Sequence, residues 1–443
     1  MKIPYPKSMG NAEINLLIIP LYLDEILIPL KSYILKSFSL ITLFLIVSCA
    51  PALKKKFRAI ETKNHGFSGL VVYEPETDKI LFEHNAHKYF TPASNIKILT
   101  LYTGLQLLED SIVALNYTQR NDSLIFTSTG DPTFLNPKFS TADKALQFLQ
   151  DSDKKLFYQS PNWEEKKYGA GWAWDDFEYS FSAQKSAFPV YGNLLHITRQ
   201  EGQTDLDIIP ELFKDSISGS NKILISKNSN ASLNKTFPFN TSEEISLKIL
   251  EAELEKSIGI ISTNFMLNKK VYSVKSDSLY KIMMHQSDNF LAEQLLIMSS
   301  VKITDTLKTD AAINFIKSEK FSMFEDKTYW VDGSGLSRYN LITPNSLVAT
   351  LNLIFKEKGK NYVKNIFPTA GQHGTLKDLL KNEGPFIYAK SGSLKNNYSL
   401  SGYLETKKGR FLIFSFMNSN FTTDSKQLKN KLEEFLLEIR NKY

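Results

Sequence analysis

A serine and a lysine at the start of a predicted helix have the types and the spacing for nucleophilic catalysis. In Ser94-Asn-Ile-Lys97 the hydroxyl and the amine are three residues apart, so on a helix they lie on one face, one turn apart. A serine attacks when a neighbouring base takes its proton, and a lysine whose pKa is lowered by burial or by another cation can be that base. The free N–H groups at the start of a helix stabilise developing negative charge.

The Ser-x-x-Lys spacing alone is a weak signal, because it recurs elsewhere in the chain. The other copies are Ser152–Lys155, Ser182–Lys185, Ser232–Lys235, Ser278–Lys281 and Ser299–Lys302. Only Ser94 follows a predicted strand hairpin and begins a strongly apolar helix. Context therefore selects Ser94 and Lys97 as the candidate nucleophile and base.

Two further short motifs follow in chain order. They are Ser287-Asp-Asn289 and Lys390-Ser-Gly392, the second in a strand-like segment that begins near Phe386. With the first motif they match the S-x-x-K, S-D-N and K-T-G signature of serine acyl-transfer enzymes, with Ser391 in place of the threonine. Each motif alone is a common accident, whereas three in the right order are not.

Each residue of these motifs has a chemical task in acyl transfer. Ser287 can relay a proton to a leaving amine, and Asn289 can bind a substrate amide. Lys390 can hold a carboxylate while it lowers the pKa of a neighbouring lysine. Gly392 would let substrate approach the strand closely, and the backbone N–H of Ser393 would form an oxyanion hole with that of the nucleophile.

The elements that must position these motifs begin with a β-hairpin. Residues 69–73 and 79–83 are strand-like runs joined by a turn-rich segment, and a helix is predicted over residues 92–108. Near the C-terminus, residues 399–404 and 410–416 have the pattern of a second hairpin. A final helix carries one apolar stripe for packing against a sheet. The stripe consists of Leu428, Leu432, Phe435, Leu436 and Ile439.

The stretch from residue 115 to residue 268 differs in character from its surroundings. It has many Asn, Ser, Asp and Lys residues between short apolar runs and few helical patterns. We interpret 115–268 as a β-rich region inserted after the nucleophile helix. The catalytic domain would then consist of residues 50–114 and 269–443.

Residues 1–49 are interpreted as a leader. An apolar run at 38–47 follows two lysines and is too short to span a bilayer, which favours a cleaved export signal over a membrane anchor. Its ending, Ile46-Val-Ser-Cys49, resembles the lipobox of bacterial lipoproteins, which implies that Cys49 becomes a lipidated N-terminus. A buried free cysteine is the alternative, but a thiol has little structural purpose directly after a signal-like run.

Composition limits the function classes. With 42% hydrophobic and 23% charged residues, the 443-residue chain is typical of a globular protein and not of a polytopic membrane protein. The net charge of +6 comes from scattered basic residues, so nucleic acid is not an expected partner. The single cysteine excludes a disulfide framework and a thiolate metal site. His84 and His87 have no acidic cluster beside them, and no glycine-rich phosphate loop occurs, so neither metal nor cofactor is expected.

The sequence around the motifs resembles that of the class C low-molecular-mass penicillin-binding proteins, the D-Ala-D-Ala carboxypeptidase/endopeptidase family. The resemblance implies a mixed α/β (α+β) fold, in which helices flank an antiparallel sheet as in transpeptidases and β-lactamases. It also implies that Ser94 is the acylated nucleophile and Lys97 the general base. The phrases that carry it, besides the catalytic motifs, are Thr91–Lys97, Gly130–Thr133, Gly171–Asp176, Asp332–Arg338 and Gly374–Leu376.

The resemblance further implies a set of substrate-binding residues. They are Ser391, Gly392, Ser393, Asp176, Phe181 and Arg338. The last three would help hold the diamino acid of a stem peptide, because a carboxylate suits a free amine. Core packing is the alternative for the aromatic residues between 172 and 181, since clustered aromatic side chains are more often core than binding surface. Residues 332–335 are expected to form a tight turn that supports the site.

The catalytic motifs and the family resemblance together predict a serine D-Ala-D-Ala carboxypeptidase or DD-endopeptidase that acts on peptidoglycan stem peptides and is acylated by penicillins. We expect it on the periplasmic side of the bacterial cell envelope, bound to a membrane through its lipid anchor. A β-lactamase shares all three motifs and stays an alternative, although no deacylating glutamate is assignable. A catalytically silent wall-binding or sensor protein is a third hypothesis. The intact Ser94, Lys97 and Lys390 argue against it, because such a protein has no need of all three.

Overall fold

The computed structural model describes residues 49–139, 144–203, 205–215 and 231–443. The chain divides into two compact units, residues 1–57 and 58–443. The predicted export signal lies outside the described residues. Cys49 is the first residue of α2 (Cys49–Asn64), and its lipidation stays a prediction. The elements that follow all belong to the second unit.

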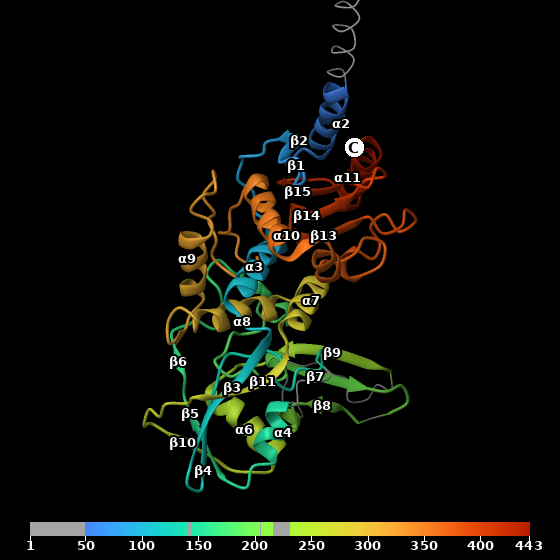
Figure 1. Cartoon of the computed structure of the whole chain (residues 1–443). Helices are drawn as coiled ribbons and strands as arrows, with labels where there is room; N and C mark the ends of the chain where they lie inside the picture. The colour runs from blue at the N-terminus through green and yellow to red at the C-terminus, as the bar shows by residue number, and fades with distance from the viewer. Residues whose placement is uncertain (1–48, 140–143, 204, 216–230) are drawn as a thin grey trace, which may run out of the picture. The chain divides into compact units, whose positions relative to one another are not determined.

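A five-stranded antiparallel sheet combines strands from both ends of the second unit (Figure 1). Its order is β13-β14-β15-β1-β2, so the first hairpin pairs with the last strand of the chain through β1 and β15. Both predicted hairpins are confirmed. The strands are β1 (Phe67–Glu74), β2 (Lys79–His84), β13 (Ile387–Leu394), β14 (Asn397–Glu405) and β15 (Phe411–Ser419). In this order β13, which carries the third motif, is an edge strand.

Helices pack against this sheet. The long helix α10 (Pro344–Ile366) contacts β1, β14 and β15, and Tyr403 Oη donates a hydrogen bond to Leu351 O at 2.9 Å. The last helix, α11 (Ser425–Lys442), lies beside β14. Its predicted stripe is confirmed, because all five members are buried: Leu428, Leu432, Phe435, Leu436 and Ile439.

The other helices of the catalytic part carry or support the motifs. They are η1 (Ala93–Ile96), α3 (Lys97–Leu107), α7 (Ser276–Gln286), α8 (Asn289–Ser300) and α9 (Thr309–Glu319). The predicted helix over 92–108 therefore begins later, as a 3₁₀ turn followed by an α-helix from Lys97. Ala93, the first residue of η1, has a left-handed φ of +50°, so a regular α-helix does not run through it from residue 92. Helix α3 packs against α8 and α10.

Between α3 and α7 the chain forms two more sheets, of order β10-β5-β4-β3-β11 and β8-β7-β9. In the first, β3 and β11 pair with Lys269 opposite Tyr117, so this sheet includes residues on both sides of the predicted limits 115 and 268. The strands are β3 (Ser111–Arg120), β4 (Ser123–Ser128), β5 (Lys155–Gln159), β7 (Leu194–Arg199), β8 (Asp207–Ile209), β9 (Leu233–Pro238), β10 (Ile258–Ile261) and β11 (Lys269–Lys275). Among the described residues, this region also contains α4 (Lys144–Gln150), η2 (Trp174–Asp176), η3 (Ser180–Ser182), η4 (Tyr191–Asn193), η5 (Glu211–Phe213) and α6 (Glu243–Leu254).

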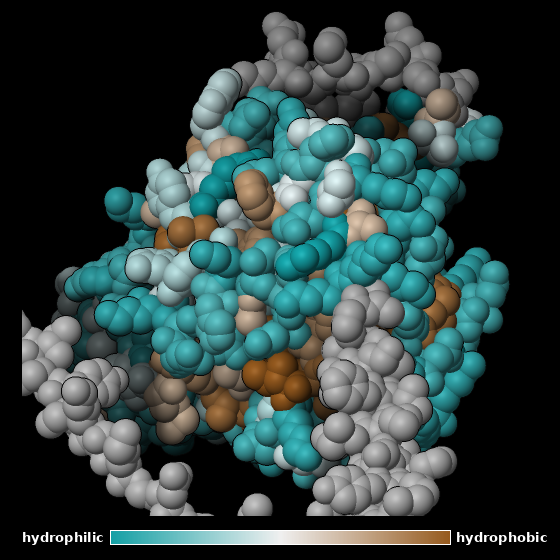
Figure 2. Space-filling model, turned by 90° about the horizontal axis from the view of Figure 1, so that it is seen from above, coloured by the Kyte–Doolittle hydropathy of each residue, from teal (hydrophilic) through white to brown (hydrophobic). Residues whose placement is uncertain are grey.

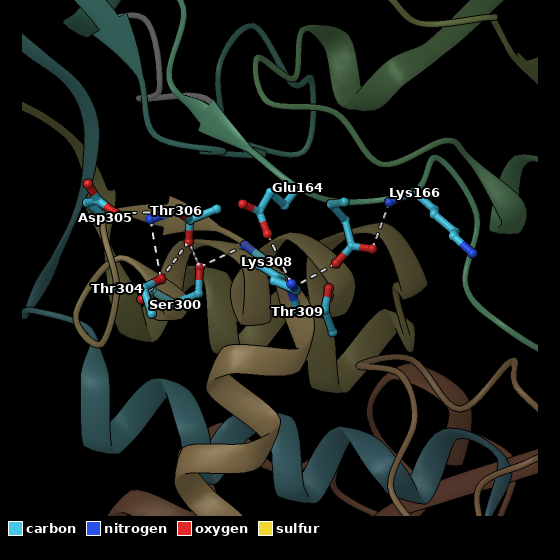
Figure 3. Close-up of polar contacts among 9 residues, drawn as sticks. Glu164, Lys166, Ser300, Thr304, Asp305, Thr306, Lys308 and Thr309 are labelled. Carbon is cyan, nitrogen blue, oxygen red and sulfur yellow. Dashed lines mark hydrogen bonds and ion pairs between the residues drawn. The ribbon is translucent and has the colours of Figure 1, made fainter. Parts of the chain in front are cut away.

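A short parallel pair, β6 (Asn162–Trp163) and β12 (Thr306–Leu307), joins the β-rich region to the segment between α8 and α9 (Figure 3). Lys308 stabilises this junction with both its side chain and its backbone. Its Nζ lies 3.0 Å from Glu164 Oε2, and its backbone N–H donates to Ser300 Oγ at 3.0 Å. The β-rich region is thereby linked to the end of α8, the helix that begins with the Asn of the second motif.

Apolar side chains are gathered mainly inside the second unit. One core cluster lies between the five-stranded sheet and helices α3, α8 and α10, and another lies within the β-rich region. The face drawn in Figure 2 is mostly hydrophilic, with hydrophobic side chains in scattered groups. No helix within the described part of the chain is long and apolar enough to cross a membrane.

Candidate active site

Ser94 and Lys97 lie side by side at the junction of η1 and α3. Lys97 is fully buried, and its Nζ donates hydrogen bonds to Ser94 Oγ at 3.1 Å, Asn289 Oδ1 at 2.7 Å and Ser334 O at 2.6 Å. An ammonium group has three donors, so all of them are satisfied. The structure thus brings the first two motifs together at one amine.

Burial makes the neutral form of Lys97 easier to reach than that of a lysine in water. Burial lowers the pKa of Lys97 to about 8, although the charges of Asp332, Asp288 and Glu293 act in the opposite direction. Burial has this effect because an ammonium without water loses its hydration energy. About half of the Lys97 amines are then neutral at pH 8, and a neutral amine next to Ser94 Oγ can accept its proton.

The third motif meets the second at another buried lysine. Lys390 Nζ donates to Ser287 Oγ at 2.8 Å and to Ser391 O at 2.7 Å. Burial, and then the charge of Lys97, holds the pKa of Lys390 well below its usual value. Ser287 lies between α7 and α8 with a left-handed φ of +56°. This tight turn allows Ser287 to contact Lys390 while Asn289 contacts Lys97.

Gly392 was expected to let substrate approach β13 closely. In the structure, the turn that carries the nucleophile approaches Gly392. A Cβ at Gly392 would lie 2.6 Å from Pro92 O and 3.0 Å from Asn95 N. Asn95 Nδ2 donates to Lys390 O at 2.9 Å, and Ser399 Oγ donates to Pro92 O at 2.8 Å. The turn that carries the nucleophile is therefore held directly on β13 and β14.

Residues 332–335 form a tight turn next to the site, as expected. The carboxylate of Asp332 organises it by accepting hydrogen bonds from Gly335 N at 2.9 Å and from Trp172 Nε1 at 2.9 Å. The turn directs the carbonyl oxygen of Ser334 to Lys97 Nζ. The sequence did not reveal this contact, because a backbone acceptor has no residue type that marks it.

Glu293 is a second buried group at this turn that the motifs did not reveal. It is 0% exposed, and its Oε1 accepts a hydrogen bond from Ser334 N at 2.8 Å, while its Oε2 has no partner among the described residues. Burial, with the charge of Asp332 adding to it, raises the pKa of Glu293 to about 7. One sequence signal was available: Glu293 follows Asn289 by four residues and so shares its helix face.

Phe181, expected to recognise the stem peptide, lies on η3 (Ser180–Ser182) beside the second motif. Asn289 Nδ2 donates to Phe181 O at 2.9 Å. The three residues Ser287, Asn289 and Phe181 line a cavity of about 270 Å³ together with Lys138 and other residues of the β-rich region. The structure therefore brings Phe181 to the catalytic motifs.

Asp176 and Arg338 are the other two residues expected to recognise the stem peptide. Asp176 ends η2 (Trp174–Asp176), and burial raises the pKa of Asp176 while the charge of Arg338 opposes this shift. Neither residue lines the cavities next to Ser287 in the described part of the chain. Their role in recognition stays a prediction.

Core packing does not account for the aromatic residues between 172 and 181. Trp174 is 81% exposed, Tyr179 57% and Phe181 43%. Phe177 is partly buried, stacked on Tyr168 with ring centroids 3.9 Å apart. The segment consists of two single-turn 3₁₀ helices and their connections, which have no continuous face that could bury all of its aromatic rings.

A larger cleft, of about 550 Å³, begins at the nucleophile. Ser94, Ser287, Ser391 and Ser393 line it, so it contains hydroxyl groups from all three motifs. Thr375, in η6 (Gly374–Leu376), shares a hydrogen bond of 2.7 Å with Ser391 Oγ. Because the buried Lys97 contacts Ser94, the motifs place a nucleophile, its base and a proton relay at one end of this cleft. Across the described residues, no three His, Cys, Asp or Glu side chains are grouped to hold a metal ion.

A family comparison agrees with this geometry. The model of the D-Ala-D-Ala carboxypeptidase 3 (S13) family matches residues 53–242 and 234–439. The chain belongs to this family. It is therefore a serine-type carboxypeptidase by membership, and the family predicted from the motifs is confirmed.

Known relatives match this family member over most of its length. The D-alanyl-D-alanine carboxypeptidase DacB of Haemophilus influenzae is 23% identical over 438 residues, 85% of this chain and 90% of that protein. The crystal structure of penicillin-binding protein 4 (dacB) from the same organism has a TM-score of 0.68 at 19% identity, covering 86% of this chain and 98% of that chain. Its complex with a β-lactam has a TM-score of 0.63 at 18% identity, with coverages of 84% and 95%. The predicted fold class is confirmed.

Proposed function

We propose that the protein removes the terminal D-Ala of peptidoglycan stem peptides and cleaves D-centre cross-links, in both cases through an acyl-enzyme on Ser94. One observation carries this proposal: the buried amine of Lys97 lies 3.1 Å from Ser94 Oγ and 2.7 Å from Asn289 Oδ1. The relative DacB is a D-alanyl-D-alanine carboxypeptidase by name, and the family membership supports the same activity here.

The first half of the reaction acylates Ser94. Its Oγ attacks the carbonyl carbon of the scissile amide while its proton passes to the neutral Nζ of Lys97. The backbone N–H groups of Ser94 and Ser393 stabilise the oxyanion of the tetrahedral intermediate. The C–N bond then breaks, and the leaving amine takes a proton from Ser287 Oγ, which Lys390 Nζ replenishes across 2.8 Å.

The second half hydrolyses the acyl-enzyme. Between the two halves Lys97 gives up the proton that it took from Ser94, and Lys390 takes one up in return. A water molecule then gives one proton to the neutral Lys97 amine and attacks the ester carbon. The ester C–O bond breaks, the shortened peptide leaves, and Ser94 Oγ takes that proton from Lys97. Lys390 and the Ser391 hydroxyl hold the carboxylate of the leaving D-Ala during the first half. Asp176, Phe181 and Arg338 recognise the diamino acid on the acyl side.

Penicillins acylate the same serine, because their β-lactam amide meets the same nucleophile and the same oxyanion hole. The complex of the Haemophilus influenzae protein with a β-lactam supports this extension. The cellular setting follows from the substrate, which belongs to the bacterial envelope. We further propose that residues 1–48 are removed on export and that a lipid on Cys49 anchors the mature chain to a membrane on the periplasmic side.

Intact-mass analysis of the purified chain after exposure to a penicillin tests the proposal, with Ser94→Ala as the matched variant. We expect one penicillin adduct on the Ser94 peptide that persists for minutes and is absent from Ser94→Ala, together with D-Ala release from a pentapeptide. Rapid loss of the adduct with turnover of the drug would indicate a β-lactamase. No adduct and no D-Ala release would refute Ser94 as an activated nucleophile.

A further inference from the structure

The cleft that begins at Ser94 continues past the edge of the sheet toward α11. Side chains along β13 alternate between the two faces, so Ser391 and Ser393 lie on the face opposite to Lys390. Ser393 pairs in register with Tyr398 of β14, and Lys429 of α11 lies over the Tyr398 ring at 5.1 Å. The part of the cleft next to Ser391 and Ser393 therefore opens on the face that α11 covers.

Cationic and polar side chains of α11 line this far end. Lys426, Lys429 and Asn430 belong to the same cleft as Ser94 and Ser391. Lys426 is exposed and Lys429 is half-buried. Within the described residues, neither ammonium group is in an ion pair. Both are therefore available to an anionic group that enters the cleft.

Proton transfer at the Ser94 end of the cleft decides which part of a substrate enters the α11 end. The leaving amine must lie beside Ser287 Oγ to receive its proton, and Ser287 contacts Lys390 at 2.8 Å. The leaving residue then has Ser391 and Thr375 beside it, and the cleft leads from there to α11. The acyl side instead faces Asn289 and Phe181, which line the separate cavity of about 270 Å³.

We propose that the α11 end of the cleft binds the leaving strand of a cross-linked peptide and that Lys426 and Lys429 attract the carboxylates of that strand. This inference rests on the proposed function and extends it to the substrate class. A leaving D-Ala has a single carboxylate, which the Ser391 hydroxyl can hold from the cleft while the buried Lys390, on the other face of β13, attracts it by its charge. The leaving strand of a cross-link is itself a stem peptide with further carboxylates, and a cleft of about 550 Å³ has room for much more than one alanine.

Two acidic residues share this cleft and fit the same ligand. Asp378 is exposed, and burial raises the pKa of Glu433, which disfavours its charged form. A carboxylate or carboxylic acid at these positions can accept hydrogen bonds from the amide N–H groups of a peptide. The lining therefore suits a peptide with carboxylates better than a simple anion.

Kinetics on two substrates with the same acyl half test the inference. One is a monomeric stem pentapeptide that releases D-Ala, and the other is a stem dimer joined by a D-centre cross-link. The variant is Lys426→Gln/Lys429→Gln. The matched control is Lys431→Gln, on the same helix but paired with Glu434 at 2.8 Å and outside the cleft lining. Penicillin acylation of Ser94 is measured for every protein.

We expect the double variant to lower kcat/KM for the cross-linked dimer about tenfold relative to kcat/KM for the pentapeptide, mainly through KM. Added salt should narrow this difference, because it screens exposed charges, and Lys431→Gln should leave the ratio unchanged. An equal loss on both substrates, an unchanged ratio, or a wild-type protein that releases D-Ala but does not cleave the dimer would overturn the inference. Failure of the proposed function is distinct, since wild-type protein would then neither bind penicillin nor release D-Ala.

Discussion

Replacing Gly335 by alanine is expected to impair catalysis more than its effect on folding explains. Gly335 has a φ of +83°, and a Cβ there would lie 1.9 Å from Ala93 O and 3.1 Å from Ser94 N. Because real Cβ atoms hardly ever approach other atoms closer than 3.0 Å, the two backbone segments must separate by about 1 Å. Ala93 directly precedes the nucleophile, and a displacement of about 1 Å at a reacting group costs about 100-fold in rate.

Gly409→Ala is the matched control for the backbone strain. Its φ of +81° is nearly the same, but no atom lies within 4 Å of the added Cβ. The left-handed conformation costs each variant about 1–2 kcal/mol of unfolding free energy. Gly335→Ala additionally loses about 1–3 kcal/mol through overpacking against η1. Urea unfolding gives these free energies, and the rate of acylation by a fluorescent penicillin gives the catalytic effect.

We expect Gly335→Ala to be acylated about 100-fold more slowly than wild type, and Gly409→Ala within about twofold of it. Acylation of Gly335→Ala at the wild-type rate would refute the argument that the 332–335 turn positions the nucleophile. So would an equal loss of rate in both variants, because strain alone would then explain the effect. Both rates are measured well below the unfolding transition, so that the folded population is the same.

Further outcomes follow from the pKa values and exposures at the site. Because burial lowers the pKa of Lys97 to about 8, penicillin acylation should rise from pH 6 to pH 9 with a midpoint near 8, and a flat profile would contradict Lys97 as the base. Glu293→Gln keeps an oxygen that accepts from Ser334 N but removes a negative charge that raises the pKa of Lys97. The midpoint of the acylation profile should therefore move to lower pH. An unmoved midpoint would show that Glu293 acts on Lys97 only through packing. Phe181→Ala should raise KM for a stem peptide severalfold with little loss of stability, because the ring is exposed and lines the cavity beside Asn289. Trp174→Ala is the control, because Trp174 is 81% exposed and outside that lining. Equal effects of the two variants would show that Phe181 does not recognise substrate.

Local patterns were enough to predict the elements that carry the motifs. Residues 69–73 and 79–83 are short apolar runs joined by a turn-rich segment, as in a hairpin, and the stripe from Leu428 to Ile439 repeats at helical spacing. Such patterns depend on neighbours within a few residues, and burial in the folded chain preserves them. The predicted helix began at residue 92, whereas α3 begins at Lys97. Ala93 has a left-handed φ, and the turn around it packs closely on Gly335 and Gly392, which are distant in the chain, so local periodicity does not reveal this turn.

The candidate site was only partly accessible from residue types. Side-chain chemistry named Ser94 and Lys97, but the acceptors around the lysine include the backbone carbonyl of Ser334, which no residue type marks. Gly392 was expected to let substrate approach β13, and this stays a prediction; the contact with the nucleophile turn at Gly392 depends on tertiary packing, which the sequence does not reveal. The exposure of Trp174 was likewise missed, because aromatic character predicts burial only on average.

The sequence by itself determined the chemistry that this protein has available: a serine, two lysines, a second serine and an asparagine, in an order and context that identify an acyl-transfer family. It also determined the hairpins and helices that hold them, because hydrophobic periodicity is a local property. Only the tertiary structure decided how this chemistry is poised. The pKa of Lys97 near 8 depends on burial among residues from η1, α8 and the 332–335 turn. The cleft depends on β13 and α11, which meet only when the sheet forms. Desolvation and cavity shape arise from residues distant in the chain, so they exist only after folding.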